Sequence, residues 1–362
     1  MTQASPPFRV LHQVLTGATF GDAITMHALD IQRWLHAAGI RSQIYALHLH
    51  ESMAEWVRPL ATYRPGRDEP FVIYHHSIGS AVPDFLLAHS PQLLLIYHNI
   101  TPPDYFKHIN PGWVQLAQQG LTQLGQLRNK TVLALAVSSF NETDLLAAGY
   151  RHTGILPIVL PQAQYDEPLN KELAQELDGK RPLLLFVGRF SPNKKQEDLV
   201  KLLAAYRRIQ PQAHLALVGD PWVIGYDHFV QEVAAYLGVA DSIMIPGKIS
   251  QRDLVTYYRY ADLYVSMSEH EGFGKPLIES MYLGLPVLAY AAPGVAATLG
   301  HSGVRVHEKD FARLAELTDI LVSDQALRQR LIVQQQEHVQ QFLETAVQQQ
   351  FLAYLQTLGD LK

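Results

Sequence analysis

Two glutamates, Glu271 and Glu279, stand eight positions apart around a glycine-rich turn, Gly272-Phe273-Gly274. The turn follows an apolar run typical of a buried strand, and it precedes a helix expected from Lys275 that carries the second glutamate. Glycines let backbone N–H groups approach an anion, and the start of a helix carries partial positive charge. The arrangement suits a sugar attached to a diphosphate, with Glu271 at sugar hydroxyls and Glu279 at a ribose diol. The helix dipole alone would favour one carboxylate there, but it leaves the glycine turn unexplained.

Two cations, Arg189 and Lys194, follow the apolar run 183–187. Arginine offers a planar fork and lysine a point charge, so together they can offset the charge of a departing diphosphate without a metal ion. The alternative is a pair of solvated surface cations. The glutamate pattern in the same half of the chain favours the functional interpretation.

Histidine is concentrated in the first half of the chain, where 11 of the 17 residues precede position 156. His98 follows the apolar run 93–97, and His75 and His76 follow the run 71–74. Strand ends are where ligands bind in α/β proteins, which favours a functional His98. For His75 and His76 a structural role and a place on the acceptor side are both open. No spacing of further ligands supports a metal site.

The elements that must position these residues alternate along the chain. Apolar runs without polar alternation, separated by helical patterns, indicate parallel sheets covered on both faces. The expected strands are residues 9–15, 42–47, 71–74, 93–97, 133–137, 183–187, 214–218, 242–245, 263–266 and 286–289. The expected helices include residues 22–39, 196–209, 227–237, 251–260, 275–283 and 310–322.

The same rhythm occurs twice, on either side of residues 157–168, whose three prolines indicate a linker. We therefore predict an α/β protein of two doubly wound domains, residues 1–162 and 163–340. The last helical stretch, residues 341–362, is expected to return to the first domain. Ligands in such folds bind at the carboxyl ends of the strands, so the two domains are expected to face each other across a ligand cleft.

The composition of the chain excludes several classes of protein and of functional site. The 362 residues carry a net charge of −5 and no cysteine, which excludes disulfides and cysteine-based sites, and the charge balance does not suit a nucleic-acid binder. No run of about 18 apolar residues predicts a membrane span, and the first residues lack the pattern of a secretory signal. A cytoplasmic protein is expected, with peripheral contact at the inner face of a membrane and the oligomeric state left open. Motifs of P-loop proteins and of serine hydrolases are absent from the sequence.

The combination of Glu-x7-Glu after an apolar strand with Gly-Arg-x4-Lys upstream resembles the retaining glycosyltransferases of family 4, which have the GT-B fold of two Rossmann-like domains. The likeness extends to residues 217–220, 247–250 and 266–272, and it covers most of the second half and the first half loosely. It implies transfer of a sugar from a UDP- or GDP-linked donor to a saccharide or lipid-linked acceptor, in polysaccharide or glycolipid synthesis. It also implies no cofactor and no required metal.

The resemblance assigns roles to individual positions. Arg189 and Lys194 would hold the donor diphosphate, Glu271 the sugar and Glu279 the ribose, and His98 would face the donor sugar. Asp22, after a glycine-rich loop that contains Gly17, would lie near phosphates or acceptor, or would only cap a helix. The remaining donor-binding positions are Gly188, Gly247, Lys248, Ile249, Gly272, Phe273, Gly274 and Leu277, of which Phe273 fits packing equally well.

The resemblance leaves two alternative functions open, and the sequence differs from the family pattern at two places. A nucleotide-sugar epimerase on the same fold and a non-catalytic nucleotide-sugar-binding partner remain alternatives. Residues 156–160 replace an Asn-Gly pair common in the family, and Lys195 stands where glycine is common. Both departures suggest a divergent branch whose acceptor cannot be transferred from well-known members.

Overall fold

The computed structural model describes residues 8–66, 69–89 and 92–358. Contacts divide the chain into two compact units. Unit 1 contains residues 1–159 and 344–362, and unit 2 contains residues 160–343. These limits lie three residues from the predicted domain limits at 162 and 340.

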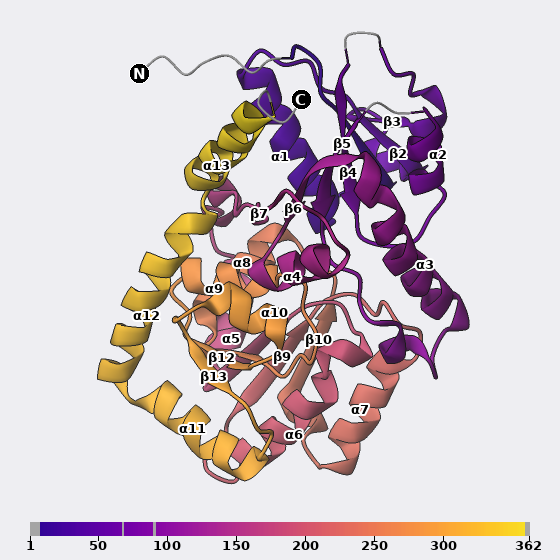
Figure 1. The fold of residues 1–362 in the computed structure, drawn as a ribbon. Helices are drawn as coiled ribbons and strands as arrows, with labels where there is room; N and C mark the ends of the chain where they lie inside the picture. Colours follow the sequence, from indigo (N-terminus) through magenta and orange to yellow (C-terminus); the bar gives the residue numbers. More distant parts are fainter. Residues whose placement is uncertain (1–7, 67–68, 90–91, 359–362) are drawn as a thin grey trace. The chain divides into compact units, whose positions relative to one another are not determined.

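Unit 1 is built on a seven-stranded parallel sheet with the strand order β3-β2-β1-β4-β5-β6-β7 (Figure 1). The order reverses between β1 and β4, which is the switch point of a doubly wound sheet. All six side chains of β4 are buried, as expected for a strand covered on both faces. The strands are β1 His12–Ala18, β2 Ile44–Leu49, β3 Val57–Pro59, β4 Phe71–His76, β5 Gln92–Tyr97, β6 Thr131–Ala136 and β7 Thr153–Ile155.

The helices of unit 1 include one from the end of the chain. Helix α13 contacts both β7 and α1: the Tyr354 hydroxyl accepts a hydrogen bond from the Ile155 N–H at 3.1 Å, and the Phe351 ring packs on Trp34. Glu344 pairs with Arg33 at the start of the same helix. The helices are α1 Ala23–Ala37, α2 Val82–His89, α3 Pro111–Leu127, α4 Ser139–Ala147 and α13 Glu344–Thr357.

Unit 2 repeats the design with a six-stranded parallel sheet in the order β10-β9-β8-β11-β12-β13. Its switch point lies between β8 and β11. The strands are β8 Leu183–Val187, β9 His214–Val218, β10 Ile243–Gly247, β11 Leu263–Ser266, β12 Val287–Tyr290 and β13 Val304–Val306. The helices are α5 Lys171–Asp178, α6 Gln196–Tyr206, α7 Tyr226–Tyr236, α8 Gln251–Tyr260, α9 Lys275–Tyr282, α10 Pro293–Leu299, α11 Phe311–Ser323 and α12 Gln325–Val339.

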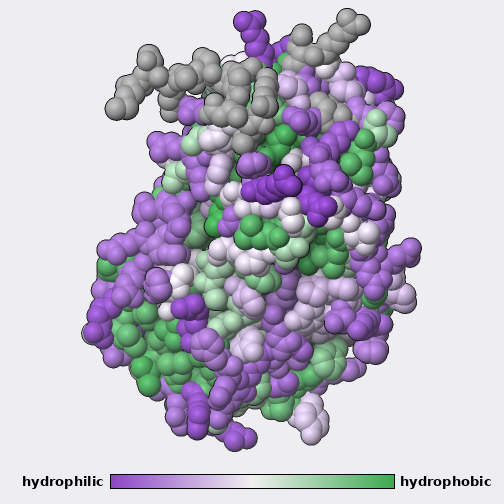
Figure 2. Space-filling model, in the orientation of Figure 1, coloured by the Kyte–Doolittle hydropathy of each residue, from purple (hydrophilic) through white to green (hydrophobic). Residues whose placement is uncertain are grey.

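The strands and helices predicted between residues 9 and 322 are confirmed, with ends displaced by at most three residues. The helical stretch predicted at residues 341–362 contains α13, Glu344–Thr357, and residues 359–362 lie outside the described part of the chain. Strands β3, β7 and β13 were not predicted, because three residues are too few for a pattern of hydrophobicity. Figure 2 shows hydrophilic side chains spread over the visible face of both units, with hydrophobic ones in smaller groups. Among the residues that the structure describes, none of the helices has the length and hydropathy of a membrane span.

Candidate active site

The loops after β8 and β11 meet at the switch point of unit 2. The loop after β8 carries Lys194 at the end of a 3-10 turn, Pro192–Lys194, and the loop after β11 carries Glu271. The Lys194 ammonium pairs with the Glu271 carboxylate, and both side chains are largely shielded, at 21% and 13% exposed. Two residues 77 positions apart are thus brought together at the place where α/β sheets bind ligands.

The glycine turn after Glu271 ends in a left-handed residue. Gly274 has φ 80° and precedes the first residue of α9, so the backbone reverses there in a conformation that L side chains rarely adopt. Phe273 is buried and packs edge-on against Phe342, with the ring centroids 5.7 Å apart. The Phe273 ring therefore packs inside unit 2, which is one of the two interpretations of this residue. The Leu277 side chain is also buried.

Glu279 lies inside α9 as a nearly buried carboxylate, only 5% exposed. The hydroxyl of Tyr165 donates to its Oε1 at 2.6 Å, and the hydroxyl of Tyr258 donates to its Oε2 at 2.7 Å. The Lys275 ammonium lies 3.6 Å from Oε1. Burial and the neighbouring Glu279 raise the pKa of both tyrosines well above the ordinary value, so both remain donors. Each carboxylate oxygen keeps a second lone pair for a further hydroxyl.

Arg189, after β8, and residues 247–249, at the end of β10, lie at the carboxyl edge of the sheet of unit 2. The Arg189 guanidinium sits over the Trp222 ring, 5.0 Å from its centroid, an arrangement that favours a cation. Gly219, after β9, lies so close to Gly188 that a Cβ there would overlap the Gly188 carbonyl oxygen. The Gly219 N–H donates to the Gly247 carbonyl at 3.1 Å. In the two residues that follow Gly247, Lys248 is exposed and Ile249 is half-buried.

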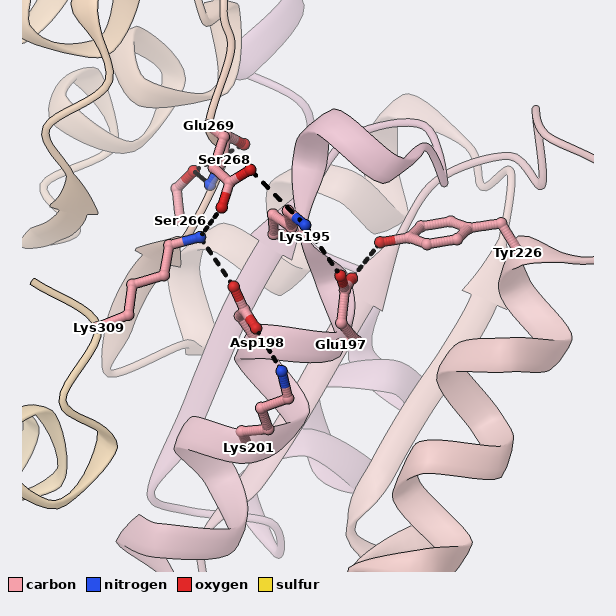
Figure 3. A network of polar contacts seen from close by, with 9 residues as sticks. All are labelled: Lys195, Glu197, Asp198, Lys201, Tyr226, Ser266, Ser268, Glu269 and Lys309. Atoms are coloured by element: carbon pink, nitrogen blue, oxygen red, sulfur yellow. Dashed lines mark hydrogen bonds and ion pairs between the residues drawn. The ribbon is translucent and has the colours of Figure 1, made fainter. Parts of the chain in front are cut away.

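A network of ion pairs that the sequence did not predict lies beside these loops (Figure 3). Lys309 bridges Asp198 of α6, at 2.8 Å, and Glu269 of the loop after β11, at 2.9 Å. Lys195 lies 3.5 Å from Glu197 and 3.6 Å from Glu269. The network therefore connects the segment that carries Lys194 with the segment that carries Glu271. Its members are dispersed in sequence, so no local pattern indicates it.

Lys195 itself has left-handed backbone angles, φ 55° and ψ 45°. A non-glycine residue there costs roughly 1 kcal/mol or more, which explains why glycine is the residue expected from the resemblance. The two carboxylates that the Lys195 ammonium approaches offset part of this cost.

Unit 1 gathers three histidines in one buried cluster. His75, at the end of β4, hydrogen-bonds His98, just after β5, with 2.9 Å between Nδ1 and Nε2. His27 of α1 packs edge-on against both rings, at centroid distances of 6.2 and 5.5 Å. His76 is not part of the cluster: its ring nitrogens hydrogen-bond the Tyr74 hydroxyl and the Gly120 carbonyl. Sequence reasoning missed His27, because inside a helix it looks like any other core position.

Burial sets the charge of these rings. It lowers the pKa of His27 to about 3 and of His76 to about 4, and it lowers the pKa of His75 and His98 well below 6.5. All four are therefore neutral near pH 7. Among the described residues no group of three histidine or carboxylate side chains has the geometry of a metal site.

The loop before α1 differs from its predicted form. Gly17 lies within β1, paired with His48, because the strand extends three residues beyond its predicted end. The Asp22 carboxylate caps α1, accepting from the N–H groups of Ile24 at 3.2 Å and Thr25 at 3.0 Å. Asp22 therefore caps helix α1 in the structure, which is one of the two roles considered for it.

The chain is similar to known proteins in part of its sequence and in its fold. Residues 170–338 match the family described as Glycosyl transferases group 1. Curated relatives include D-inositol 3-phosphate glycosyltransferases of Stackebrandtia nassauensis, 29% identical over 58% of this chain and 50% of the relative, and of Frankia alni, 32% identical over 46% and 42%. The matches thus span half or less of the length of these relatives.

Similar solved structures cover nearly the whole chain. Anabaena HepE in complex with UDP-glucose superposes with a TM-score of 0.77 at 18% identity, over 96% of this chain and 99% of that one. Sucrose-phosphate synthase from Thermosynechococcus elongatus gives 0.75 at 19% identity, over 98% and 100%. At this level of identity the matches establish the fold.

Proposed function

We propose that this chain, whose residues 170–338 match the glycosyl transferases group 1 and which has the GT-B fold, transfers a sugar from a nucleoside-diphosphate sugar to an acceptor hydroxyl. The observation that carries the proposal is the pairing of Lys194 with Glu271 at the switch point of unit 2. A cation for the diphosphate and a carboxylate for the sugar then stand next to each other.

Donor binding follows from the chemistry of each group. Lys194 pairs with Glu271, and a diphosphate would take over this ammonium and free the carboxylate for sugar hydroxyls. Arg189, held over Trp222, supplies the second positive charge. Glu279, already oriented by two tyrosines, uses its remaining lone pairs for the ribose diol.

Main-chain groups complete the proposed donor site. The turn 272–274 offers N–H groups at the start of α9, where the helix dipole favours an anion. The segment 247–249, at the end of β10, lies next to the base. These contacts need no metal ion, because the two protein cations compensate the diphosphate.

The proposed chemistry retains the anomeric configuration. The bond from the anomeric carbon to the diphosphate oxygen breaks, and the acceptor oxygen bonds to the same face of that carbon. The departing phosphate oxygen takes the acceptor proton, and the diphosphate leaves with the electron pair of the broken bond. Glu271, freed from Lys194 by the diphosphate, serves as a binding group for sugar hydroxyls and not as a covalent nucleophile.

For the acceptor we propose a saccharide or a lipid-linked sugar of surface polysaccharide or glycolipid synthesis. The names of the curated relatives add inositol 3-phosphate to the acceptors worth testing. Their activity is a candidate for this chain, since the matches span half or less of their length.

The test is a transfer assay with UDP- and GDP-sugars in EDTA, each paired with these acceptors. Release of free nucleoside diphosphate together with a glycosylated acceptor of retained configuration is expected. Glu271→Ala and Lys194→Ala should each lower turnover at least tenfold in a folded protein. The matched control is Lys180→Ala, which removes another ion pair of unit 2, with Glu176. Normal turnover in both site variants would refute the site.

The same assay separates the two alternatives. A product sugar that is still attached to the nucleotide identifies an epimerase. Nucleotide binding without turnover of any donor identifies a non-catalytic binding partner.

A further inference from the structure

A chain of three hydrogen bonds leads from a backbone carbonyl to His98 in the core of unit 1. Gln13 Nε2 donates to the Ala28 carbonyl at 2.9 Å, and Gln13 Oε1 lies 2.9 Å from His75 Nε2. His75 Nδ1 in turn lies 2.9 Å from His98 Nε2. The planes of the two imidazoles differ by only 22°, which suits an in-plane hydrogen bond between ring nitrogens. At most 9% of any of these three side chains is exposed.

The main chain places His98 at the end of this chain of bonds. Strands β4 and β5 are parallel neighbours, and the His98 N–H donates to the His76 carbonyl at 2.9 Å. Asn99 then has φ 78°, so the backbone turns sharply after His98. The ring of His98 is thereby held against His75, one strand away.

The direction of each hydrogen bond follows from its neighbour. Because the Gln13 NH2 group faces a carbonyl, its Oε1 faces His75 and can only accept. His75 Nε2 therefore carries the proton. A neutral imidazole has one N–H, so His75 Nδ1 is an acceptor, and His98 Nε2 must carry the proton that binds it.

The last nitrogen in this series of hydrogen-bonded side chains is His98 Nδ1. As the second nitrogen of a neutral ring whose Nε2 is protonated, it holds a lone pair. It is buried and has no hydrogen-bond partner among the described residues. A buried acceptor without a donor is destabilising, so a ligand that donates a hydrogen bond to this atom would be favoured. His27, the ring packed edge-on against His98, brings no charge to the site because its pKa is about 3.

We propose that Gln13 and His75 lock His98 in the Nε2–H tautomer, so that the atom it offers to a ligand is the acceptor Nδ1, specific for a hydrogen-bond donor such as a hydroxyl. This inference rests on the proposed function for the identity of the ligand, but the tautomer itself does not. Gln13 and His75 are positioning residues that act through His98. The lock makes His98 unsuited to phosphate oxygens, which accept hydrogen bonds, and selective for a sugar that keeps one particular hydroxyl.

The tautomer is measured first, in the full chain labelled with 15N-histidine. Long-range 1H–15N correlation spectra distinguish a protonated ring nitrogen from an unprotonated one, and the His98 signals are assigned by their loss in His98→Gln. The expected result at pH 7.5 is a protonated Nε2 and an unprotonated Nδ1. A protonated Nδ1, or a doubly protonated ring, would overturn the inference whatever the activity of the protein.

The variant Gln13→Met tests the lock, since it keeps the length of the side chain and removes the acceptor for His75. The matched control is Gln123→Met, because Gln123 is another buried glutamine of unit 1 and bonds the backbone of Ser80. In Gln13→Met, His98 should become a mixture of tautomers and turnover should fall about tenfold, with the Kd of the nucleoside diphosphate changed less than twofold. The control should keep the single tautomer. An unchanged His98 in Gln13→Met would overturn the role of Gln13.

A series of deoxy sugars identifies the hydroxyl and does not depend on how the glutamine variants fold. Donors that lack one hydroxyl at a time are compared in wild type and His98→Gln. One position should lose about tenfold in kcat/KM in wild type and less than twofold in the variant. If every position loses equally in both proteins, His98 does not read a sugar hydroxyl. If no donor binds wild type at all, the proposed function fails while the tautomer measurement stands.

Discussion

Mild acid should unfold unit 1, because four of its histidines are buried as neutral rings. Burial lowers the pKa of His27 to about 3 and of His76 to about 4, and it lowers the pKa of His75 and His98 well below 6.5. In the unfolded chain each of them takes up a proton near pH 6.5. Their contribution to stability is therefore complete above pH 6.5 and is lost as the pH falls from 6.5 toward the folded values.

The magnitude follows from proton linkage. Each histidine that is charged only in the unfolded state lowers the free energy of unfolding by about 1.4 kcal/mol per pH unit. Because the unfolded rings are only half protonated at pH 6.5, the loss between pH 6.5 and 5.0 is about 1.7 kcal/mol for each ring and at most about 7 kcal/mol for four. Domains have a free energy of unfolding of about 5–15 kcal/mol, so the loss is comparable to the whole. Burial raises the pKa of Glu69 and Asp144, and these carboxyls offset part of the loss at lower pH.

Urea unfolding at several pH values between 8 and 5 measures this effect. Three of the four tryptophans, Trp34, Trp56 and Trp113, lie in unit 1, so a Trp222→Phe background makes tryptophan fluorescence report on that unit. The urea midpoint should be constant from pH 8 to 7 and should fall steeply below 6.5.

Single substitutions in the same background test the cause. His27→Phe removes one buried ring that titrates on unfolding, so the slope should decrease by about 1.4 kcal/mol per pH unit. The control is His108→Phe, at an exposed position of unit 1, which should leave the slope unchanged. A midpoint that stays constant down to pH 5 in the parent protein would show that these histidines are solvated or charged in the folded state, and the reasoning would be wrong.

Three substitutions in unit 2 test the residues that support the proposed donor site. Tyr258→Phe should lower the free energy of unfolding in urea by about 1.5–3 kcal/mol, because its hydroxyl bonds a buried carboxylate; Tyr257→Phe on the same helix is the control, and equal losses in both would contradict the account. Lys309→Met should lower kcat about tenfold, because the bridge needs a cation between two carboxylates, and Lys309→Arg should keep most of the activity. A fully active Lys309→Met would show that the bridge does not support the site. Gly294→Ala places a Cβ against the Glu271 carbonyl oxygen and should lower turnover at least tenfold with an unchanged circular dichroism spectrum, whereas normal turnover would show that this turn yields without loss.

Hydrophobic pattern predicted most of the fold because it reports burial on two faces. The runs 71–74 and 183–187 have no polar alternation, and both are strands in the interior of parallel sheets. The same pattern carries little information on strands of three residues, such as β7, whose pairing depends on a neighbour formed elsewhere in the chain. The resemblance to a family, in turn, came from short motifs at strand ends.

The contacts of the site residues were less accessible to sequence reasoning. The pairing of Lys194 with Glu271 follows from two predicted strand ends that are neighbours in the sheet. The tyrosines around Glu279 and the bridging Lys309 come from distant positions with no motif of their own. Asp22 shows a different limit, since a carboxylate before a helix has the same local sequence whether it binds a ligand or caps the helix.

Binding of nucleoside diphosphates tests the central claim most directly. Titration calorimetry with UDP, GDP, ADP and dTDP, in EDTA and again with Mg²⁺, compares wild type with Lys194→Met and with Lys180→Met as the control. The account predicts that one nucleotide binds wild type with the same Kd in EDTA and in Mg²⁺, and that Lys194→Met weakens it at least tenfold while the control does not. Binding that requires Mg²⁺, or that is equally tight in Lys194→Met, would contradict it.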